Sequence, residues 1–201
     1  MKSVIIASLV ASAAAFAPAQ VGRASTSVAL DISGQIGAQA PLGAFDPLGI
    51  MKDADQEKFD TWREIEIVHG RVAMLAVSGY LTTYAGVRFP GADDVPAGFA
   101  AVNWLMTTDE GHLILPQMWT TFLIATMINR DASEVTGVKP AFPGDYRNGK
   151  LDFGWDKLDD KTKARKRSIE LNNGRAAQMG ILALMTHEAM GNVGAILPLA
   201  N

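Results

Sequence analysis

Three stretches of the chain combine the length of a membrane helix with mainly apolar residues, and they span residues 65–87, 112–128 and 169–191. A helix that crosses the apolar core of a bilayer takes about 20 residues, with some tolerance. The middle stretch is the shortest, and Pro116 lies near its start, where a missing backbone N–H costs least. The pattern predicts an all-α membrane protein with three transmembrane helices.

The two loops between these stretches differ in charge. Residues 89–111 contain four acidic residues and no Lys or Arg, whereas residues 129–168 contain ten Lys and Arg. Basic loops stay on the side from which a membrane protein inserts. The N-terminus and the basic loop are therefore expected on one side, with the acidic loop and the C-terminus on the other. Alternatively, the basic run 161–167 is only a solvated helix face.

The first 30 residues have the composition of targeting segments rather than of a folded domain. Residues 1–15 predict a signal peptide, because Lys2 precedes a short apolar core and the small residues 13–15 suit cleavage. Residues 16–30 are rich in Ser, Thr and Ala and contain no acid, which is typical of a transit segment. The junction "AAAFAPA" resembles the two-part presequence of plastid proteins in algae with secondary plastids. A plain secretory signal followed by a linker is the alternative. Residues 31–201 then form one domain.

Composition excludes several classes of function. Hydrophobic residues make up 48% of the chain and charged residues 19%, which suits a few membrane helices with polar connections. The net charge of −3 and the absence of a basic stripe argue against nucleic acid binding. Without cysteine, no disulfide, thiolate metal site or cysteine nucleophile is possible. The sequence has no His-Glu-x-x-His motif, Gly-rich phosphate loop or Ser/His/Asp pattern, so no enzyme chemistry is indicated.

The first and third stretches repeat one another. "REIEIVHGRVAMLAV" (63–77) and "RSIELNNGRAAQMGI" (167–181) are identical at six of fifteen positions, 104 residues apart. The identities include a Glu, a Gly and an Arg at the same spacing in both copies. The repeat suggests an internal duplication and two crossed helices related by a pseudo-two-fold axis along the membrane normal.

Charged residues inside a membrane usually pair within the helix bundle, because an isolated charge costs several kcal/mol there. The Glu and Arg of each copy are five residues apart and point about 140° away from each other around the helix. They are therefore expected to pair between the two copies, as Glu66–Arg175 and Arg71–Glu170. Gly70 and Gly174 lie between them, where small residues let helix backbones approach closely.

Other polar residues in these stretches have no such partner. His69 and Asn173 follow the two glutamates by three residues, and His187 lies further along the third stretch. Carboxylate, amide and imidazole donors at different membrane depths suit separate sites that each supply one ligand to a metal. A magnesium ion held in a macrocycle needs one such protein ligand. Alternatively, Asn173 forms a helix–helix hydrogen bond, His187 reaches the membrane interface, and His69 packs in the bundle.

These segments resemble a known family. "EIVHGRVAML" and "ELNNGRAAQMG" are similar to the first and third membrane helices of the light-harvesting chlorophyll-binding family, and "FDPLG" (45–49) fits it too. The region from residue 152 to 191 resembles more closely the fucoxanthin chlorophyll a/c proteins of diatoms and related algae. The resemblance implies that Arg71 and Arg175 form the crossed pairs. It also implies six ligands to chlorophyll magnesium, which are Glu66, His69, Gln117, Glu170, Asn173 and His187.

The resemblance implies a light-harvesting antenna in the plastid thylakoid membrane, with its N-terminus and basic loop in the stroma. Its cofactors would be chlorophyll a, chlorophyll c and a carotenoid, with fucoxanthin expected. Its partners would be these pigments, thylakoid lipids, other antenna subunits and photosystem I or II. Two alternatives stay open: a photoprotective, energy-dissipating member of the same family, and a small ion or proton transporter that uses the Glu–Arg pairs as a relay.

Overall fold

The computed structural model describes residues 31–52, 54–88, 90, 92–109, 116, 120, 140–147, 152 and 154–197. The helices within these ranges are α2 (Gln56–Tyr84), α3 (Ala100–Thr107), α5 (Asp160–Ala189) and α6 (Val193–Ile196). These ranges contain no strand beyond one isolated bridge between Gln39 and Gly43, so the expected helical class is confirmed. The targeting segments lie outside the described residues, and so does the stretch 112–128 except for Pro116 and Thr120. The predicted ligand Gln117 lies in that stretch and is therefore also outside the described residues.

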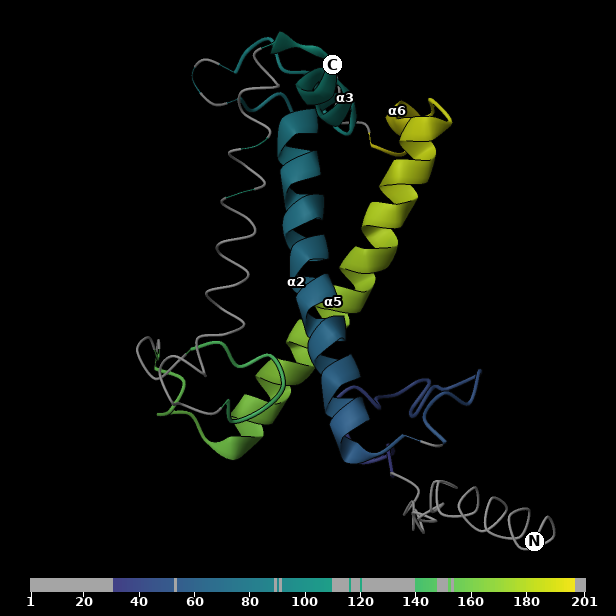
Figure 1. Cartoon of the computed structure of the whole chain (residues 1–201), viewed down its shortest axis with the longest axis vertical. Coiled ribbons are helices and arrows are strands. Elements are labelled where there is room, and N and C mark those ends of the chain that lie inside the picture. The colour runs from purple at the N-terminus through teal and green to yellow at the C-terminus, as the bar shows by residue number, and fades with distance from the viewer. Residues whose placement is uncertain are drawn as a thin grey trace, which may run out of the picture.

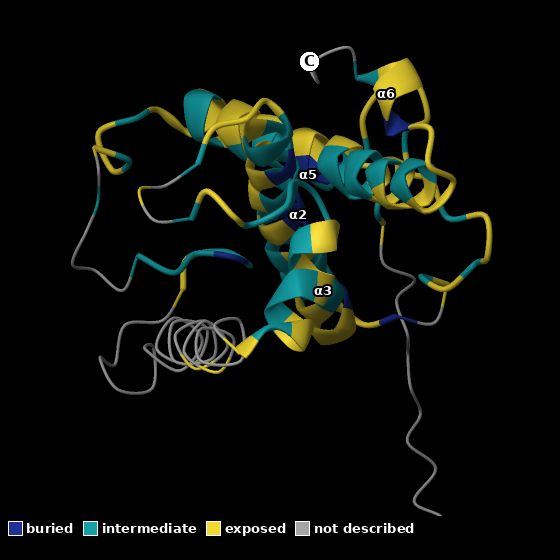
Figure 2. Ribbon diagram, turned by 90° about the horizontal axis from the view of Figure 1, so that it is seen from above, coloured by how far each residue is buried: buried dark blue, intermediate teal, exposed yellow. Residues whose placement is uncertain are grey.

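The two long helices cross one another near their middles and form an X (Figure 1). The buried positions gather where α2 and α5 meet, as Figure 2 shows from above. At the crossing they are Gly70 and Ala73 of α2, with Leu171 and Gly174 of α5. The expected contact between the first and third stretches is therefore present.

The helix bounds differ from the predicted stretches at both ends. Both helices begin nine residues earlier, α2 after Asp55 and α5 after Asp159, and the Asp55 carboxylate accepts a hydrogen bond from the Lys58 N–H at 2.9 Å. Asp55 and Asp159 are 104 residues apart, so the repeat extends back to the helix starts. The helices end at Tyr84 and Ala189, three and two residues before the ends of the predicted stretches. Gly86 and Gly191 adopt positive φ angles of 84° and 70°, a conformation that ends a helix.

Only a thin core is buried between these elements. Large apolar side chains remain exposed on the flanks of both helices, for example Leu75 with 74% and Met179 with 68% of its surface accessible. Across the described ranges, none of the helices has both the length and the continuous apolar character that crossing a bilayer demands.

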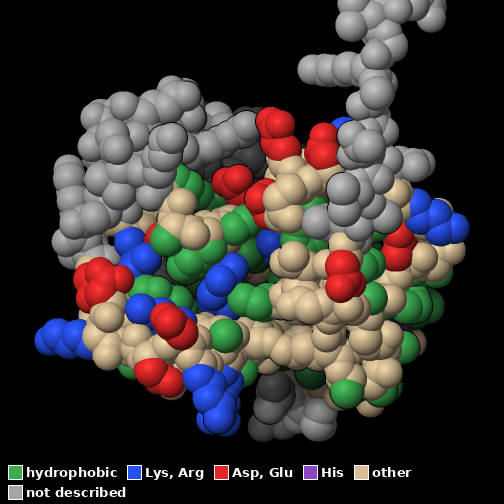
Figure 3. All heavy atoms as spheres, turned by 90° about the horizontal axis from the view of Figure 1, so that it is seen from below, with side chains coloured by type: hydrophobic (Ala, Val, Ile, Leu, Met, Phe, Trp, Pro, Cys, Tyr) green, Lys and Arg blue, Asp and Glu red, His purple; other side chains and the backbone are tan. Residues whose placement is uncertain are grey.

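The end of the molecule at which α2 and α5 begin is rich in charge. Figure 3 shows acidic and basic side chains interspersed with apolar ones over this end. Residues 140–147 dock here, because the Tyr146 hydroxyl donates to Glu64 Oε1 of α2 at 2.7 Å. Arg147 holds this segment in shape, and its hydrogen bond to Asp145 lowers the pKa of that carboxyl. Arg147 forms ion pairs with Asp145, Asp152 and Asp156.

Candidate functional site

The helix crossing is built on two glycines. A Cβ atom added to Gly70 would lie 2.9 Å from Cα of Gly174, and one added to Gly174 would lie equally close to Gly70. Because the neighbouring atoms belong to the backbone, no rotation of a side chain could make room. The predicted close approach of the two helix backbones is confirmed.

Two ion pairs flank this glycine contact, each joining one helix to the other. Arg71 Nε donates to Glu170 Oε1 at 2.7 Å, and Arg175 Nε donates to Glu66 Oε1 at 2.7 Å. The four side chains are only partly buried, with 29% to 42% of their surfaces accessible. Both crossed pairs predicted from the repeat are therefore present, and they lock α2 against α5 above and below the crossing point.

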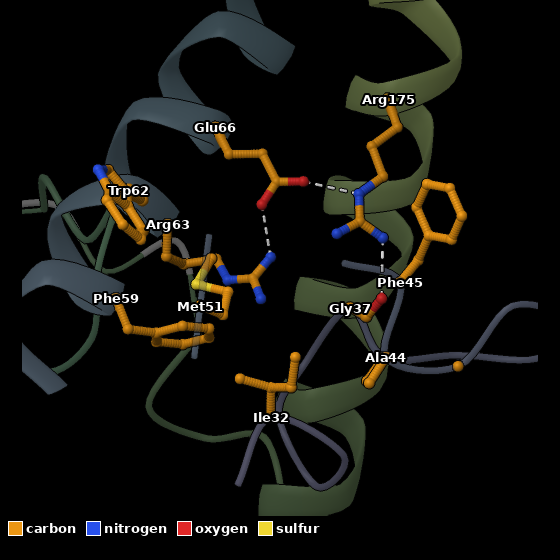
Figure 4. A pocket seen from close by; sticks show the side chains of 12 residues that line it. Ile32, Gly37, Ala44, Phe45, Met51, Phe59, Trp62, Arg63, Glu66 and Arg175 are labelled. Carbon is orange, nitrogen blue, oxygen red and sulfur yellow. Dashed lines mark hydrogen bonds and ion pairs between the residues drawn. The ribbon is translucent and has the colours of Figure 1, made fainter. Parts of the chain in front are cut away.

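The two glutamates nevertheless differ in their surroundings. Glu66 accepts a second charged hydrogen bond, from Arg63 Nη1 to Oε2 at 2.6 Å, so that each of its oxygens faces a guanidinium (Figure 4). The residue that corresponds to Arg63 in the repeat is Arg167. Its guanidinium lies 4.1 Å from the centroid of the Phe142 ring, and within the described residues it forms no ion pair with Glu170. The Arg63 contact was not predicted from the sequence, although the three-residue spacing to Glu66 is a recognised signal for a helical ion pair.

A cavity of about 210 Å³ lies beside the Arg63–Glu66–Arg175 cluster. Residues 32–51 cover it, and Arg175 Nη1 donates to the carbonyl of Gly37 at 2.8 Å (Figure 4). Gly37 has a φ of +104°, and a Cβ atom there would lie 2.5 Å from the Leu171 side chain. A glycine is therefore required where the N-terminal segment reaches the ion pair. Apolar side chains and this one charged cluster line the cavity together.

His69 lies on the outer surface of α2, one turn after Glu66. Its Nδ1 is 2.8 Å from the backbone carbonyl of Ile65. A carbonyl oxygen can only accept a hydrogen bond, so Nδ1 carries the proton in this contact. The lone pair of Nε2 is then free, which is the form in which a neutral imidazole binds a metal.

The remaining predicted ligands lie apart from one another. Asn173 is exposed on α5, one turn after Glu170, and His187 lies in the last turn of that helix. His187 Nδ1 is 2.9 Å from Oδ1 of Asn192, and the Nε2 atom of the same ring takes no part in this hydrogen bond. No group of three or more His, Asp or Glu side chains that could hold a metal occurs in the described part of the chain.

This donor set fits a metal that a macrocycle already holds. Each site offers one lone pair as a ligand, and the macrocycle fills the other coordination positions of the metal. Because an arginine neutralises each glutamate, a carboxylate could bind Mg²⁺ without leaving an unpaired charge in an apolar environment. Oxygen donors are also the ligands that magnesium prefers. The residues present can therefore accept the magnesium of chlorophyll.

Comparison with known proteins agrees with this chemistry. The sequence model of the chlorophyll A-B binding protein family matches residues 32–189. The chain is 50% identical to the chloroplastic fucoxanthin-chlorophyll a-c binding protein F of Phaeodactylum tricornutum, over 95% of the chain and 97% of that protein. It is 47% identical to the corresponding protein of Trieres chinensis, over 95% and 96%. It is 41% identical to protein B of Macrocystis pyrifera, over 85% and 78%.

Proposed function

Because the chain belongs to the chlorophyll a-b binding protein family, we propose that it is a light-harvesting antenna protein of the chloroplast. Its cofactors are chlorophyll a, chlorophyll c and the carotenoid fucoxanthin, which are the pigments or pigment classes in the names of its relatives. When bound, these pigments absorb light and pass the excitation from one to the next. The protein holds them at fixed separations and carries out no bond-making chemistry itself.

The proposal rests above all on the crossed pair of helices and on the partly or fully exposed donor side chains along them. The two inter-helix ion pairs make a rigid core from which side chains extend at several levels. We propose that six of them each supply one axial ligand to a chlorophyll magnesium. They are Glu66, His69, Gln117, Glu170, Asn173 and His187, of which Gln117 lies outside the described residues.

The two glutamates and His69 would each perform their task with the help of a partner within the protein. Arg175 and Arg71 donate hydrogen bonds to Glu66 and Glu170, so that each carboxylate facing a metal would have its countercharge within the protein. The Ile65 carbonyl holds the proton of His69 on Nδ1 and thereby keeps Nε2 able to bind. The amide oxygen of Asn173 needs no such help, because it does not titrate.

We further propose that the protein lies in the thylakoid membrane, with spans near residues 65–87, 112–128 and 169–191. Family membership and the contrast between the loops support this, and pairing of Glu and Arg lowers the cost of placing charge at membrane depth. Residues 1–15 and 16–30 would act in turn as signal peptide and transit segment. Photosystem I or II, other antenna subunits and thylakoid lipids would be the partners.

The proposed orientation can be tested with single cysteines, because the natural chain has none. A membrane-impermeant maleimide added to intact thylakoids is expected to label Lys161→Cys, which lies in the basic segment on the stromal side. Asp94→Cys, in the acidic loop, should be labelled only after the thylakoids are broken. Both positions are exposed, so a reversed pattern would mean the opposite topology.

Pigment analysis tests the function itself. The native protein should purify with chlorophyll a, chlorophyll c and carotenoid, and its fluorescence excitation spectrum should show that light absorbed by carotenoid excites chlorophyll a. An energy-dissipating member would carry the same pigments but show a strongly shortened fluorescence lifetime. A transporter would carry no chlorophyll, which would refute the proposal.

His69→Leu examines one ligand within this proposal. Removing the imidazole takes away one donor while the inter-helix ion pairs stay intact, so the protein should fold and lose about one chlorophyll. Ser78→Leu is the matched control, since it places leucine at another exposed position of α2. Chlorophyll per polypeptide and the red absorption band measure the outcome. If His69→Leu kept the native ratio of chlorophyll to polypeptide, His69 would not be a ligand and would only pack in the bundle.

A further inference from the structure

The C-terminal end of α5 brings His187 and Asn192 together through the backbone. The helix ends at Ala189, and Gly191 turns the chain back with a φ of +70°. Gly191 N–H donates to the Glu188 carbonyl at 3.0 Å, and Asn192 N–H donates to the His187 carbonyl at 3.1 Å. These two bonds define a Schellman motif, in which the residue after the turn lies beside a residue of the last helical turn.

An apolar contact usually accompanies this motif. Here the two side chains form a hydrogen bond instead, with His187 Nδ1 and Asn192 Oδ1 at 2.9 Å. The amide oxygen only accepts, so it requires the proton of a neutral imidazole on Nδ1 and leaves the Nε2 lone pair free. Without an acceptor at this place, the proton could move to Nε2 and block it as a metal ligand.

We propose that Asn192 is a positioning residue that holds His187 in the tautomer and ring orientation needed to bind a chlorophyll magnesium. This inference rests on the proposed function, and in particular on His187 as a ligand. Partners of this kind are common behind metal-binding histidines, and losing one typically lowers metal affinity about 10–100-fold. Asn192 would act only through His187 and would not touch the metal.

The other long helix shows that the turn itself does not need this polar pair. α2 ends with the same two backbone bonds, from Gly86 N–H to the Thr83 carbonyl and from Val87 N–H to the Thr82 carbonyl, both at 3.2 Å. Gly86 has a φ of +84°, close to that of Gly191. The side chains at the equivalent positions are Thr82 and Val87, which offer no imidazole. The His–Asn pair is therefore an addition to a turn that closes without it.

Two substitutions at position 192 test whether Asn192 positions His187. Asn192→Leu removes the acceptor and restores the usual apolar side chain, whereas Asn192→Asp keeps an oxygen that can only accept. The protein reconstituted with pigments is measured for chlorophyll per polypeptide and for chlorophyll lost on dilution. Asn103→Leu, at an exposed position of α3, is the matched control.

We expect Asn192→Leu to weaken the binding of one chlorophyll about 10-fold. Asn192→Asp should retain that chlorophyll at the native level, and Asn103→Leu should have no effect. The chain contains only three histidines, so ¹⁵N-histidine NMR can resolve the ring of His187 in the reconstituted protein. Once the chlorophyll at this site has been released by dilution, native protein and Asn192→Asp should keep the proton on Nδ1, and Asn192→Leu should show a mixture of tautomers.

His187→Leu separates failure of this inference from failure of the proposed function. If the native protein binds no chlorophyll, the proposed function is wrong. If His187→Leu keeps every chlorophyll, His187 is not a ligand and the inference fails with it. If His187→Leu loses one chlorophyll but Asn192→Leu binds it as tightly as the native protein, His187 is a ligand and Asn192 does not position it.

Discussion

Arg175→Leu is expected to prevent stable assembly of the protein with its pigments. The substitution removes the guanidinium that pairs with Glu66 across the helix crossing, together with its hydrogen bond to the Gly37 carbonyl. Breaking one partner of a buried ion pair costs roughly 3–5 kcal/mol. Because the Arg175 and Glu66 side chains remain 42% and 29% exposed and Glu66 keeps its ion pair with Arg63, we expect no more than the lower end, about 3 kcal/mol.

The measurement is the yield of pigmented protein after reconstitution, followed by the midpoint of thermal pigment release. Arg165→Leu is the control, since it removes an arginine of the same helix from an exposed position. If Arg175→Leu assembled as well as Arg165→Leu, the inter-helix ion pair would have no role in stability.

Gly174→Ala is expected to force the two long helices apart. The added methyl group would meet the backbone of Gly70 at 2.9 Å, so the crossing can accept it only by moving a whole helix. Overpacking of this kind typically costs about 1–3 kcal/mol, and the upper end applies where backbone rather than a side chain obstructs. The separation would also lengthen both ion pairs, which lie on either side of the contact.

Gly79→Ala provides a matched comparison within α2. Nothing lies within 4 Å of a Cβ atom at that position, so the same substitution meets open space. Alanine also favours a helix over glycine by up to about 1 kcal/mol, which makes a small gain in stability the expected result. Equal thermal midpoints for Gly174→Ala and Gly79→Ala would contradict the close packing of the helix backbones.

The centre of this site could be predicted because the sequence repeats itself there. Glu66 and Arg71 cannot reach each other along one helix, and the second copy supplied partners of matching charge and spacing. Gly70 and Gly174 followed from the same comparison, since a close crossing needs small residues between the pairs. Local charge, helix geometry and the repeat all point to one arrangement.

The features that were missed depend on neighbouring loops and turns and on charged helical turns outside the apolar stretches. Arg63 and Arg167 are equivalent in sequence, yet one pairs with Glu66 and the other stacks on Phe142, because a different loop packs beside each. The helix starts were missed because the predicted stretches followed apolar residues, whereas the helices continue through charged turns to Asp55 and Asp159. The contact of Asn192 with His187 depends on the turn at Gly191, which hydrophobic periodicity does not reveal.

Glu66 pairs with two arginines and Glu170 with one, and this difference has a consequence for the absorption of pigments bound there. Arg63, Glu66 and Arg175 together carry a net charge of +1, whereas Arg71 and Glu170 cancel each other. Chlorophylls held by Glu66 and by Glu170 would therefore feel different electric fields, although their ligand is the same chemical group. If both glutamates hold chlorophylls, the excited states of these two pigments would differ in energy. The duplicated pair of sites would then form a step in energy for the excitation, to which Arg63 contributes.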